Sequence, residues 1–165
     1  MDLFSRQKEF RVLYETHYND LCRASFNILL EKENAREIVQ QVFLDLWDKQ
    51  NWHRLNSVKA YLYVAVYNRS LNLIKTRKRF VSLDAMPETT AGHADLETEE
   101  LRLTIISGIE ALPDRCREIF LLKREGDMTY QEIADHLQLS IKTVERQMGI
   151  ALEKLRNHLD AHWSG

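Results

Sequence analysis

Hydrophobic residues recur at steps of three and four along most of the chain, a spacing typical of amphipathic α-helices. In the first half this spacing covers residues 4–30, 35–47 and 58–78. The first stretch predicts either one long helix or a helix pair, and the polar residues 31–34 after it predict a turn. Residues 1–80 show no strand-like alternation, so we expect this half to be helical.

In the second half the helical spacing returns at residues 97–110. Pro113 suits the first turn of a further helix, and Gly126 is a natural C-cap for it. Residues 129–155 then predict two helices joined by a very short turn at residues 138–140.

The helix pair in residues 129–155 carries clear capping signals. Thr129 can cap the first helix, and Glu132, three residues on, can complete a capping box. Ser140 is a good N-cap for the second helix. The apolar stripe predicted for that helix consists of Val144, Met148, Ala151, Leu152 and Leu155.

Polar residues at the start of the second helix face away from its apolar stripe. They are Lys142, Thr143, Glu145, Arg146 and Gln147. A capped helix-turn-helix of this kind places its second helix in the major groove of DNA, with its first residues on base edges. Because the caps, the turn length and the polar set agree, we predict a DNA-reading unit. A plain helical hairpin in an all-helical core is the alternative.

Composition narrows the class of protein. Five glycines and two prolines in 165 residues favour long helices with few turns. The chain has no run of about eighteen apolar residues and no signal-peptide character at its start, so we expect a cytoplasmic protein that does not insert into a membrane. Cys22 and Cys116 lie far apart, which fits two free thiols in a reducing setting. His158 and His162 lack a third ligand candidate nearby, so we expect no metal site, and we expect no cofactor.

The net charge of −2 hides an uneven distribution. Residues 1–80 carry a net charge of +5, residues 81–100 of −6 and residues 101–165 of −1. Residues 81–100 also lack basic residues and clear periodicity, which is typical of a linker. We therefore predict an all-α protein with two small helical domains, 1–80 and 101–165, joined by a flexible acidic linker.

A polar loop in the basic first domain suits contact with nucleic acid. Residues 49–57 hold Trp52, His53 and Arg54, which could stack on an unpaired strand and contact its charge. A Trp52 folded back onto the core is equally compatible with the sequence. Ser57 can cap the helix that follows.

The helix predicted over residues 58–78 ends in a basic run, Lys75-Thr76-Arg77-Lys78-Arg79. A helix C-terminus favours positive charge in any case, which accounts for one or two of these residues. Four basic residues in five, below a ladder of tyrosines and asparagines, instead predict a phosphate-binding edge. The side chains that we expect to project from this helix are Tyr63, Tyr67, Asn68, Asn72 and Lys75.

The helix predicted over residues 35–47 has one apolar residue on its polar side. Leu44 lies there among Glu37, Gln40, Gln41, Asp45 and Asp48. An apolar residue in that place suggests a partner surface, although single exposed apolar residues are common. The pattern alone leaves both readings open.

These patterns together resemble a known family over about residues 8–160. The segments that carry the resemblance in the first half are AREIVQQVFLDLW at residues 35–47 and AYLY at 60–63, with Asn68 to Arg79 after it; in the second half they are LP at 112–113, REIF at 117–120, YQEIA at 130–134 and TV at 143–144. Each is weak alone, but their order and spacing are specific. On this resemblance the chain is identified as a member of the sigma-70 family, in its extracytoplasmic-function (ECF) subfamily. These proteins are two-domain promoter-recognition subunits of RNA polymerase, built from sigma regions 2 and 4.

The resemblance implies roles for the first domain. The surface that docks on the clamp helices of the largest polymerase subunit would comprise Glu37, Gln40, Gln41, Leu44 and Asp48. The loop and helix that open and read the −10 element would hold a base, extruded from the stack, in a pocket of the loop. The implied −10 contacts are Asn51, Trp52, Arg54, Ser57, Lys59, Tyr63, Tyr67, Asn68, Asn72, Lys75, Arg77, Lys78 and Arg79.

For the second domain the resemblance implies a −35 reader that also touches the polymerase flap. The implied −35 contacts are Thr129, Tyr130, Ser140, Lys142, Thr143, Glu145, Arg146 and Gln147. The acidic linker resembles the segment that threads toward the active-site channel. The implied function is that of a sigma factor, which binds core RNA polymerase and directs promoter-specific transcription initiation.

The chain departs from the family pattern at two places. Many relatives have acids where Arg36 and Gln41 stand, and a basic run of the Arg-Ser-Arg type where Glu145, Arg146 and Gln147 stand. The use of glutamate and glutamine at these positions resembles sigma factors of the Bacteroidetes lineage. Their usual controller is a membrane-bound anti-sigma factor of the iron-citrate-regulator type. The resemblance therefore implies such a partner.

Two other classes of protein compete with this interpretation. Residues 129–155 also resemble the DNA-binding domain of response regulators, which act without binding core polymerase. Such a regulator would carry a sensor or phosphoacceptor domain of alternating strands and helices, and residues 1–80 show no such pattern. An enzyme is not expected, since no Gly-rich phosphate loop, metal-ligand cluster or nucleophile–base arrangement is visible.

Overall fold

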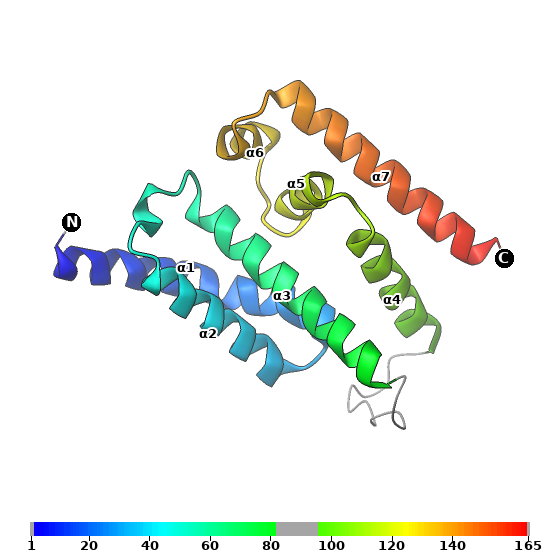
Figure 1. Ribbon diagram of the computed structural model, residues 1–165, viewed down its shortest axis with the longest axis horizontal. Helices are drawn as coiled ribbons and strands as arrows, with labels where there is room; N and C mark the ends of the chain where they lie inside the picture. The colour runs from blue at the N-terminus through cyan, green and yellow to red at the C-terminus, as the bar shows by residue number, and fades with distance from the viewer. Residues whose placement is uncertain (1, 82–95, 165) are drawn as a thin grey trace. The chain divides into compact units, whose positions relative to one another are not determined.

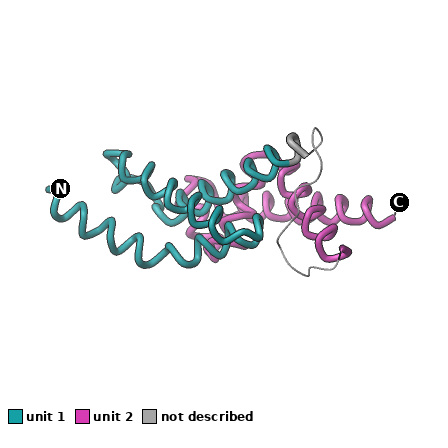
Figure 2. Tube along the Cα trace, turned by 90° about the horizontal axis from the view of Figure 1, so that it is seen from below, with its two compact units in different colours: residues 1–78 teal, residues 79–165 magenta. Residues whose placement is uncertain are grey.

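The chain folds into helices in a computed structural model that describes residues 2–81 and 96–164, with side chains for 2–77 and 96–164. Within these ranges there is no β-strand, so the predicted all-α fold is confirmed. The chain divides into two compact units, unit 1 (Met1–Lys78) and unit 2 (Arg79–Gly165), shown in teal and magenta in Figure 2.

Unit 1 contains three α-helices and one 3₁₀ turn (Figure 1). They are α1 (Leu3–Leu29), α2 (Lys32–Asp48), η1 (Trp52–Arg54) and α3 (Val58–Val81). Residues 4–30 therefore form one long helix and not a pair. α1 ends at Leu30, whose left-handed backbone (φ 57°) reverses the chain, and its N–H donates to the Phe26 carbonyl.

Helix α2 begins three residues before the position that the polar pattern predicted. Lys32 and Glu33 continue the helix, and Glu31 is its N-cap. The side chain of Asn34, which we placed in a turn, donates a hydrogen bond to the Glu31 carboxylate. Lysine and glutamate are good helix formers, and an acid in the first turn interacts favourably with the helix dipole, so a polar stretch here does not break the helix.

Apolar side chains from all three helices fill the core of unit 1. The fully buried ones include Leu21, Val39, Leu46, Leu62 and Val66. At the loop end of this core the ring of Phe10 meets several other aromatic rings edge-on, at centroid distances of 5.9 Å to Phe43, 5.0 Å to Trp47 and 6.2 Å to Trp52. This aromatic cluster joins α1, α2 and η1.

A buried hydroxyl pair links α1 to α3. The hydroxyl of Ser70 donates to the Val66 carbonyl (2.7 Å), and the hydroxyl oxygens of Ser25 and Ser70 lie 2.8 Å apart. Because the Ser70 proton is used on the carbonyl, Ser25 is the donor of this second bond. Both serines are fully buried, and both satisfy their donors inside the core.

The described residues 96–164 of unit 2 form four helices: α4 (Leu96–Glu110), α5 (Asp114–Arg124), α6 (Tyr130–Leu137) and α7 (Ile141–Trp163). α7 is the long helix against which α4, α5 and α6 all pack. α4 begins inside the segment 81–100 that we predicted to be a linker, because Leu96 to Glu100 already form its first turn. Residues 82–95 of that predicted linker lie outside the described residues.

The helix-turn-helix of unit 2 has the caps that its sequence indicates. The Thr129 hydroxyl oxygen accepts from the Glu132 N–H (3.1 Å), and its proton goes to the Glu132 carboxylate (3.2 Å), so the reciprocal bond is made to the hydroxyl and not to the backbone amide. Ser140 caps α7 by accepting from the Thr143 N–H at 3.1 Å. Between the helices Gln138 is left-handed (φ 56°).

Two sequence expectations in unit 2 are wrong. Gly126 is not a left-handed C-cap, since the left-handed residue after α5 is Asp127 (φ 48°), a residue type that tolerates this conformation. Glycine is required at 126 because a Cβ there would lie 2.8 Å from the Leu122 carbonyl oxygen. Leu152, expected on the buried stripe, is 46% exposed, because it lies about 100° round α7 from the buried Ala151.

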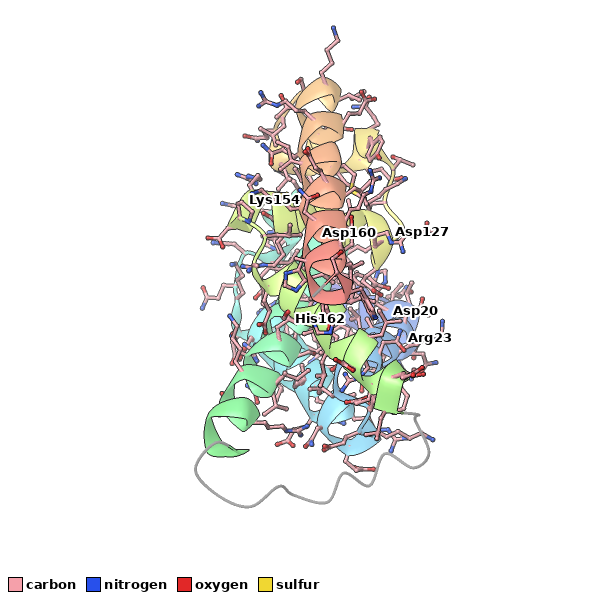
Figure 3. The ribbon with its side chains drawn as sticks, turned by 90° about the vertical axis from the view of Figure 1, so that its right-hand side faces the viewer. Asp20, Arg23, Asp127, Lys154, Asp160 and His162 are labelled. Carbon is pink, nitrogen blue, oxygen red and sulfur yellow. The ribbon has the colours of Figure 1, made fainter. Side chains whose placement is uncertain are left out.

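α4 packs closely on the C-terminal half of α7, which Lys154, Asp160 and His162 mark in Figure 3. A Cβ at Gly108 of α4 would come within 2.9 Å of the His158 ring. That ring makes a 2.9 Å hydrogen bond to Ser107, and His162, one turn on, lies 3.1 Å from the Glu100 carboxylate. The two histidines therefore fasten α4 to α7.

Gly108→Ala tests this close approach. Helix propensity alone would favour alanine by about 1 kcal/mol, but the new methyl would push against the hydrogen-bonded His158 ring. We expect the free energy of unfolding to fall by about 1–2 kcal/mol, measured by chemical denaturation. Gly149→Ala on α7 is the matched control, because a Cβ there meets no atom within 4 Å; equal stabilisation of both variants would contradict the close-packing account.

Candidate nucleic-acid and protein interfaces

The predicted docking residues of α2 share one exposed face of the helix. Glu37, Gln40, Gln41, Leu44 and Asp48 are all exposed and occupy positions i, i+3, i+4, i+7 and i+11, which lie on one side of a helix. Leu44 has 58% of its surface exposed, in the middle of these polar side chains. We call these five residues the α2 face. A single large apolar residue within a polar rim is an arrangement found at protein–protein contacts.

An ion pair between α2 and α3 supports the α2 face from beneath. Arg69 of α3 pairs with the Asp45 carboxylate, and Gln41 donates to the same carboxylate at 3.2 Å. The hydrogen bond from Arg69 lowers the pKa of Asp45, so this carboxyl stays ionised and keeps its two partners. Sequence reasoning missed this pair, because the two residues are 24 positions apart and no local pattern connects them.

The structure contradicts the predicted −10 contact of one loop residue, Trp52. Trp52 is only 2% exposed, because its indole packs against Phe10 in the aromatic cluster. Of the two readings that the sequence left open, the Trp folded onto the core is therefore the one observed. Asn51 and Arg54 of the same turn are exposed.

Ser57 of the same loop has a structural role. Its hydroxyl oxygen accepts from the Ala60 N–H at 3.1 Å and so caps the N-terminus of α3. The loop therefore ends at a capped helix, and its exposed polar side chains precede that cap.

The tyrosines predicted to form a ladder on α3 are not on the surface. Tyr63 and Tyr67 are buried, since α3 buries a broad face that also includes Leu62, Val66 and Leu71. A helix that packs against more than one neighbour buries a wider arc than a simple amphipathic stripe, and the two tyrosines fall within that arc.

The remaining α3 candidates are more accessible than the tyrosines. Asn72 and Lys75 are exposed, while Lys59 and Asn68 are half-buried. These four side chains and the loop residues Asn51 and Arg54 make up what we call the α3 face.

One residue of the basic run is already engaged in the free chain. Both terminal nitrogens of Arg77 bind the two carboxylate oxygens of Glu31, the N-cap of α2, at 2.9 and 3.0 Å. This bidentate pair offsets the positive charge of Arg77 and engages both of its terminal nitrogens, so it competes with phosphate binding. The side chains of Lys78 and Arg79 lie outside the described residues, and their phosphate contacts stay predictions.

At the start of α7 the cationic and acidic candidates lie on the surface. Lys142, Glu145 and Arg146 are exposed; Lys142 and Arg146 lie on the side opposite the buried Val144 and Met148, and Glu145 lies between the two sides. This exposed set follows directly after the Ser140 cap. The first two turns of α7 therefore present a mixed-charge surface, which we call the α7 reading surface.

The other predicted −35 contact residues are half-buried or have structural roles within the fold. Thr143 and Gln147 are half-buried, and Thr129 and Ser140 are exposed but serve as N-caps. Tyr130 is half-buried beneath a cation, with the Lys123 Nζ 4.8 Å from its ring centroid.

Neither a metal site nor a membrane span is found in the described part of the chain. No group of three or more potential metal ligands comes together within residues 2–81 and 96–164. None of the helices in these ranges is both long enough and apolar enough to cross a bilayer.

Comparison with known families assigns both units. Residues 13–80 match the family described as Sigma-70 region 2, and residues 102–155 match the family described as Sigma-70, region 4. The first match covers α2, the loop and nearly all of α3, and the second covers the helix-turn-helix and most of α4.

Relatives align over nearly the whole chain. The ECF RNA polymerase sigma factor SigK of Mycobacterium tuberculosis is 24% identical over 167 residues, which cover 93% of this chain and 87% of that protein. The ferric citrate uptake sigma factor FecI of Escherichia coli K12 is 27% identical over 153 residues, which cover 87% of each chain.

Two solved structures share the fold. CnrH, in complex with the cytosolic domain of CnrY, has a TM-score of 0.55 and 23% identity, and the match covers 94% of this chain and 90% of that one. The sigma factor RpoE, in complex with the anti-sigma factor NepR from Bartonella quintana, has a TM-score of 0.51 and 20% identity, with 93% and 98% covered.

The two matched regions occur in the order of a sigma factor, and the relatives align across both of them. No strand interrupts the described residues, as it would in the receiver domain of a response regulator. The chain has a region 2 unit followed by a region 4 unit, and its relatives include ECF sigma factors. It therefore belongs to the ECF group of the sigma-70 family.

Proposed function

We propose that three separate surfaces of this chain divide the work of a sigma factor, which binds core RNA polymerase and directs promoter-specific transcription initiation. The α2 face docks on the polymerase, the α3 face contacts the −10 element, and the α7 reading surface contacts the −35 element. The single observation that carries this proposal is the capped helix-turn-helix, whose second helix exposes Lys142, Glu145 and Arg146 directly after its N-cap.

The α2 face is proposed as the polymerase contact because Leu44 combines exposure with a polar surround. Burial of a leucine side chain is worth about 2 kcal/mol, and the rim of glutamate, glutamine and aspartate can supply directional hydrogen bonds. In the family the matching surface meets the clamp helices of the largest polymerase subunit.

For the −10 element, we assign direct contact to the α3 face and a supporting role to the buried aromatic residues. Asn51 and Arg54 lie in the loop, and Lys59, Asn68, Asn72 and Lys75 lie along α3. An extruded base must be stabilised against an unstacking cost of roughly a few kcal/mol. Trp52, Tyr63 and Tyr67 support this surface by fixing the loop and α3 on the core.

For the −35 element, we assign base contact to the α7 reading surface and positioning to the capping residues. Arginine can bind guanine through two hydrogen bonds in the major groove, and glutamate can accept from the cytosine amino group. Arg146 and Glu145 are the residues of this chain that suit these contacts. Half-buried Thr143 and Gln147 lie beside them, and Thr129 and Ser140 orient the two helices.

We also propose control by an anti-sigma factor anchored in the membrane, in the manner of the Bacteroidetes type. The mixed Glu-Arg-Gln run at residues 145–147 supports this finer assignment, and so does the similarity to the ferric citrate sigma factor. Both solved structures that share the fold were determined as complexes, one with the cytosolic domain of CnrY and one with an anti-sigma factor.

Transcription with purified components tests the function. The chain is mixed with core RNA polymerase and a promoter library, and the transcripts are sequenced. A sigma factor confers start sites that share upstream elements, and core polymerase alone gives none. If transcripts from shared start sites appear only when a second sigma factor is added, the chain is a regulator and the proposal is wrong.

Arg146→Ala should relax selectivity at the −35 element. Loss of a bidentate base contact costs about 1–3 kcal/mol of discrimination, because the variant binds the correct and altered elements more equally. Binding to a set of single-base −35 variants measures this, with Arg156→Ala, an exposed arginine further along α7, as the control. Unchanged base preference would remove Arg146 from the reading residues.

Leu44→Ala should weaken binding to core polymerase without loss of fold. Truncation of an apolar anchor at an interface costs about 1–2 kcal/mol, or roughly a 5- to 30-fold rise in Kd. Val12→Ala is a matched control, because Val12 of α1 is also 58% exposed but lies outside the α2 face. Equal effects of the two variants, measured by titration of labelled chain with core polymerase, would argue against the α2 face as the docking surface.

Glu31→Gln should strengthen promoter binding by freeing Arg77 for a phosphate. We expect the salt dependence of binding to steepen by about one unit of slope, while the free energy of unfolding falls by less than about 1 kcal/mol, since the pair is partly exposed. Glu33→Gln removes the same charge two residues away, where the ionic partner is Arg36 and not Arg77. An equal change in both variants would mean that only net charge matters.

A further inference from the structure

Gly149 occupies an unusual place in α7. It lies near the middle of this 23-residue helix and is exposed. Glycine inside a helix is less stable than alanine, because it loses more conformational freedom on folding. A Cβ built at Gly149 would meet no atom within 4 Å, so nothing in the described part of the chain requires a glycine there.

The other glycines of unit 2 whose surroundings are described have internal reasons. A Cβ at Gly108 would lie 2.9 Å from the His158 ring, and one at Gly126 would lie 2.8 Å from the Leu122 carbonyl oxygen. Gly149 differs from both, since the space above it is open. Any requirement for glycine at this position would therefore come from a molecule that binds there.

The position of Gly149 on the helix indicates which molecule this is. Lys142, Arg146 and Gly149 follow one another at steps of four and three and are all exposed, opposite the buried Val144 and Met148. Gly149 therefore continues the stripe of the α7 reading surface. The seven residue steps from Lys142 to Gly149 span about 10 Å of helix, which approaches the width of the major groove, about 12 Å.

We propose that Gly149 is the point at which α7 passes against the sugar–phosphate backbone at the wall of the major groove. The absence of a side chain there lets the helix come close enough for Lys142, Glu145 and Arg146 to reach base edges. The proposal rests on the proposed function of unit 2 as the −35 reader. The proposal adds Gly149 as a residue that determines how deeply α7 enters the groove. Gly149 does not determine which base is preferred.

Charge on the neighbouring turns fits this placement. Arg146, on the turn before Gly149, can pair with phosphate or base, whereas Glu153, on the turn after, is exposed and carries the same sign as the backbone. We therefore place the end of the proposed contact between Gly149 and Glu153.

A protein occupant is less well supported. Within one turn of Gly149, Leu152 is the only large apolar side chain among the described residues that is exposed. The core of a protein interface usually needs a larger apolar patch.

The experiment compares wild-type chain with Gly149→Ala, each assembled with core polymerase and measured on a promoter that the wild-type chain uses. Alanine favours the helix and meets no neighbour, so we expect the Tm of the free chain to rise by about 2–4 °C. We expect promoter affinity to fall about tenfold, by equal factors for intact and altered −35 sequences. Gly149→Leu, with a longer side chain, should lower the affinity further.

Asn157→Ala is the matched control. Asn157 is an exposed residue of α7 beyond Glu153, so alanine there also favours the helix but lies outside the proposed contact. We expect a similar rise in Tm with unchanged promoter affinity. This control separates an effect of helix stability from an effect of close approach.

Three outcomes would overturn the inference. Unchanged promoter affinity in Gly149→Ala would show that a Cβ is tolerated, and loss confined to one base position would make Gly149 a reading residue. Weaker assembly with core polymerase at unchanged DNA affinity would assign the position to a protein partner. These outcomes all require an active wild-type chain, whereas failure of the proposed function would appear as a wild-type chain that directs no promoter-specific transcripts.

Discussion

The left-handed backbone of Gln138 sets the direction of α7, and the reading function that we propose for unit 2 depends on it. The N–H of Leu139 bonds back to the Ala134 carbonyl at 2.9 Å, which closes the end of α6, and Ser140 opens α7 after it. With only Leu139 between the C-cap Gln138 and the N-cap Ser140, the angle between the helices has little freedom. The exposed side chains of the first α7 turns are therefore presented from a fixed frame.

In unit 1 the predicted DNA-contacting surface includes a loop, and this loop has few of the backbone hydrogen bonds that hold a helix. The loop is held by its own aromatic residue. Trp52 inserts into the cluster around Phe10, and Ser57 ties the end of the loop to α3. Burial of an aromatic ring is a strong constraint, and it leaves the exposed Asn51 and Arg54 on a short, well-supported turn.

The helices and the helix-turn-helix could be predicted from the sequence, because both depend on local features: the spacing of hydrophobic residues and the capping residues. It failed where tertiary packing decides the outcome. Tyr63 and Tyr67 carry hydroxyl groups and sit at positions that a single amphipathic stripe would leave exposed, yet packing against more than one helix buries them. Leu152 shows the reverse case, since no neighbouring helix covers it.

Contacts between distant residues were also beyond prediction. Arg77 looked like one more cation in a basic run, and only the fold brings Glu31 to it across 46 positions. The α2 face was recognisable from its spacing, but the Arg69 that holds Asp45 beneath it was not. The end of α3 therefore carries less free positive charge than the sequence suggests at Arg77, and α2 is fastened to α3 through Asp45 and Arg69.

One continuous helix carries two separate attachments in unit 2. The reading surface occupies the start of α7, while His158 and His162 hold α4 near its other end. At 1.5 Å per residue the 23 residues of α7 form a rod about 34 Å long. A small tilt of α7 applied by a protein bound to α4 would therefore become a larger displacement at the first turns of α7, which we propose contact the −35 element.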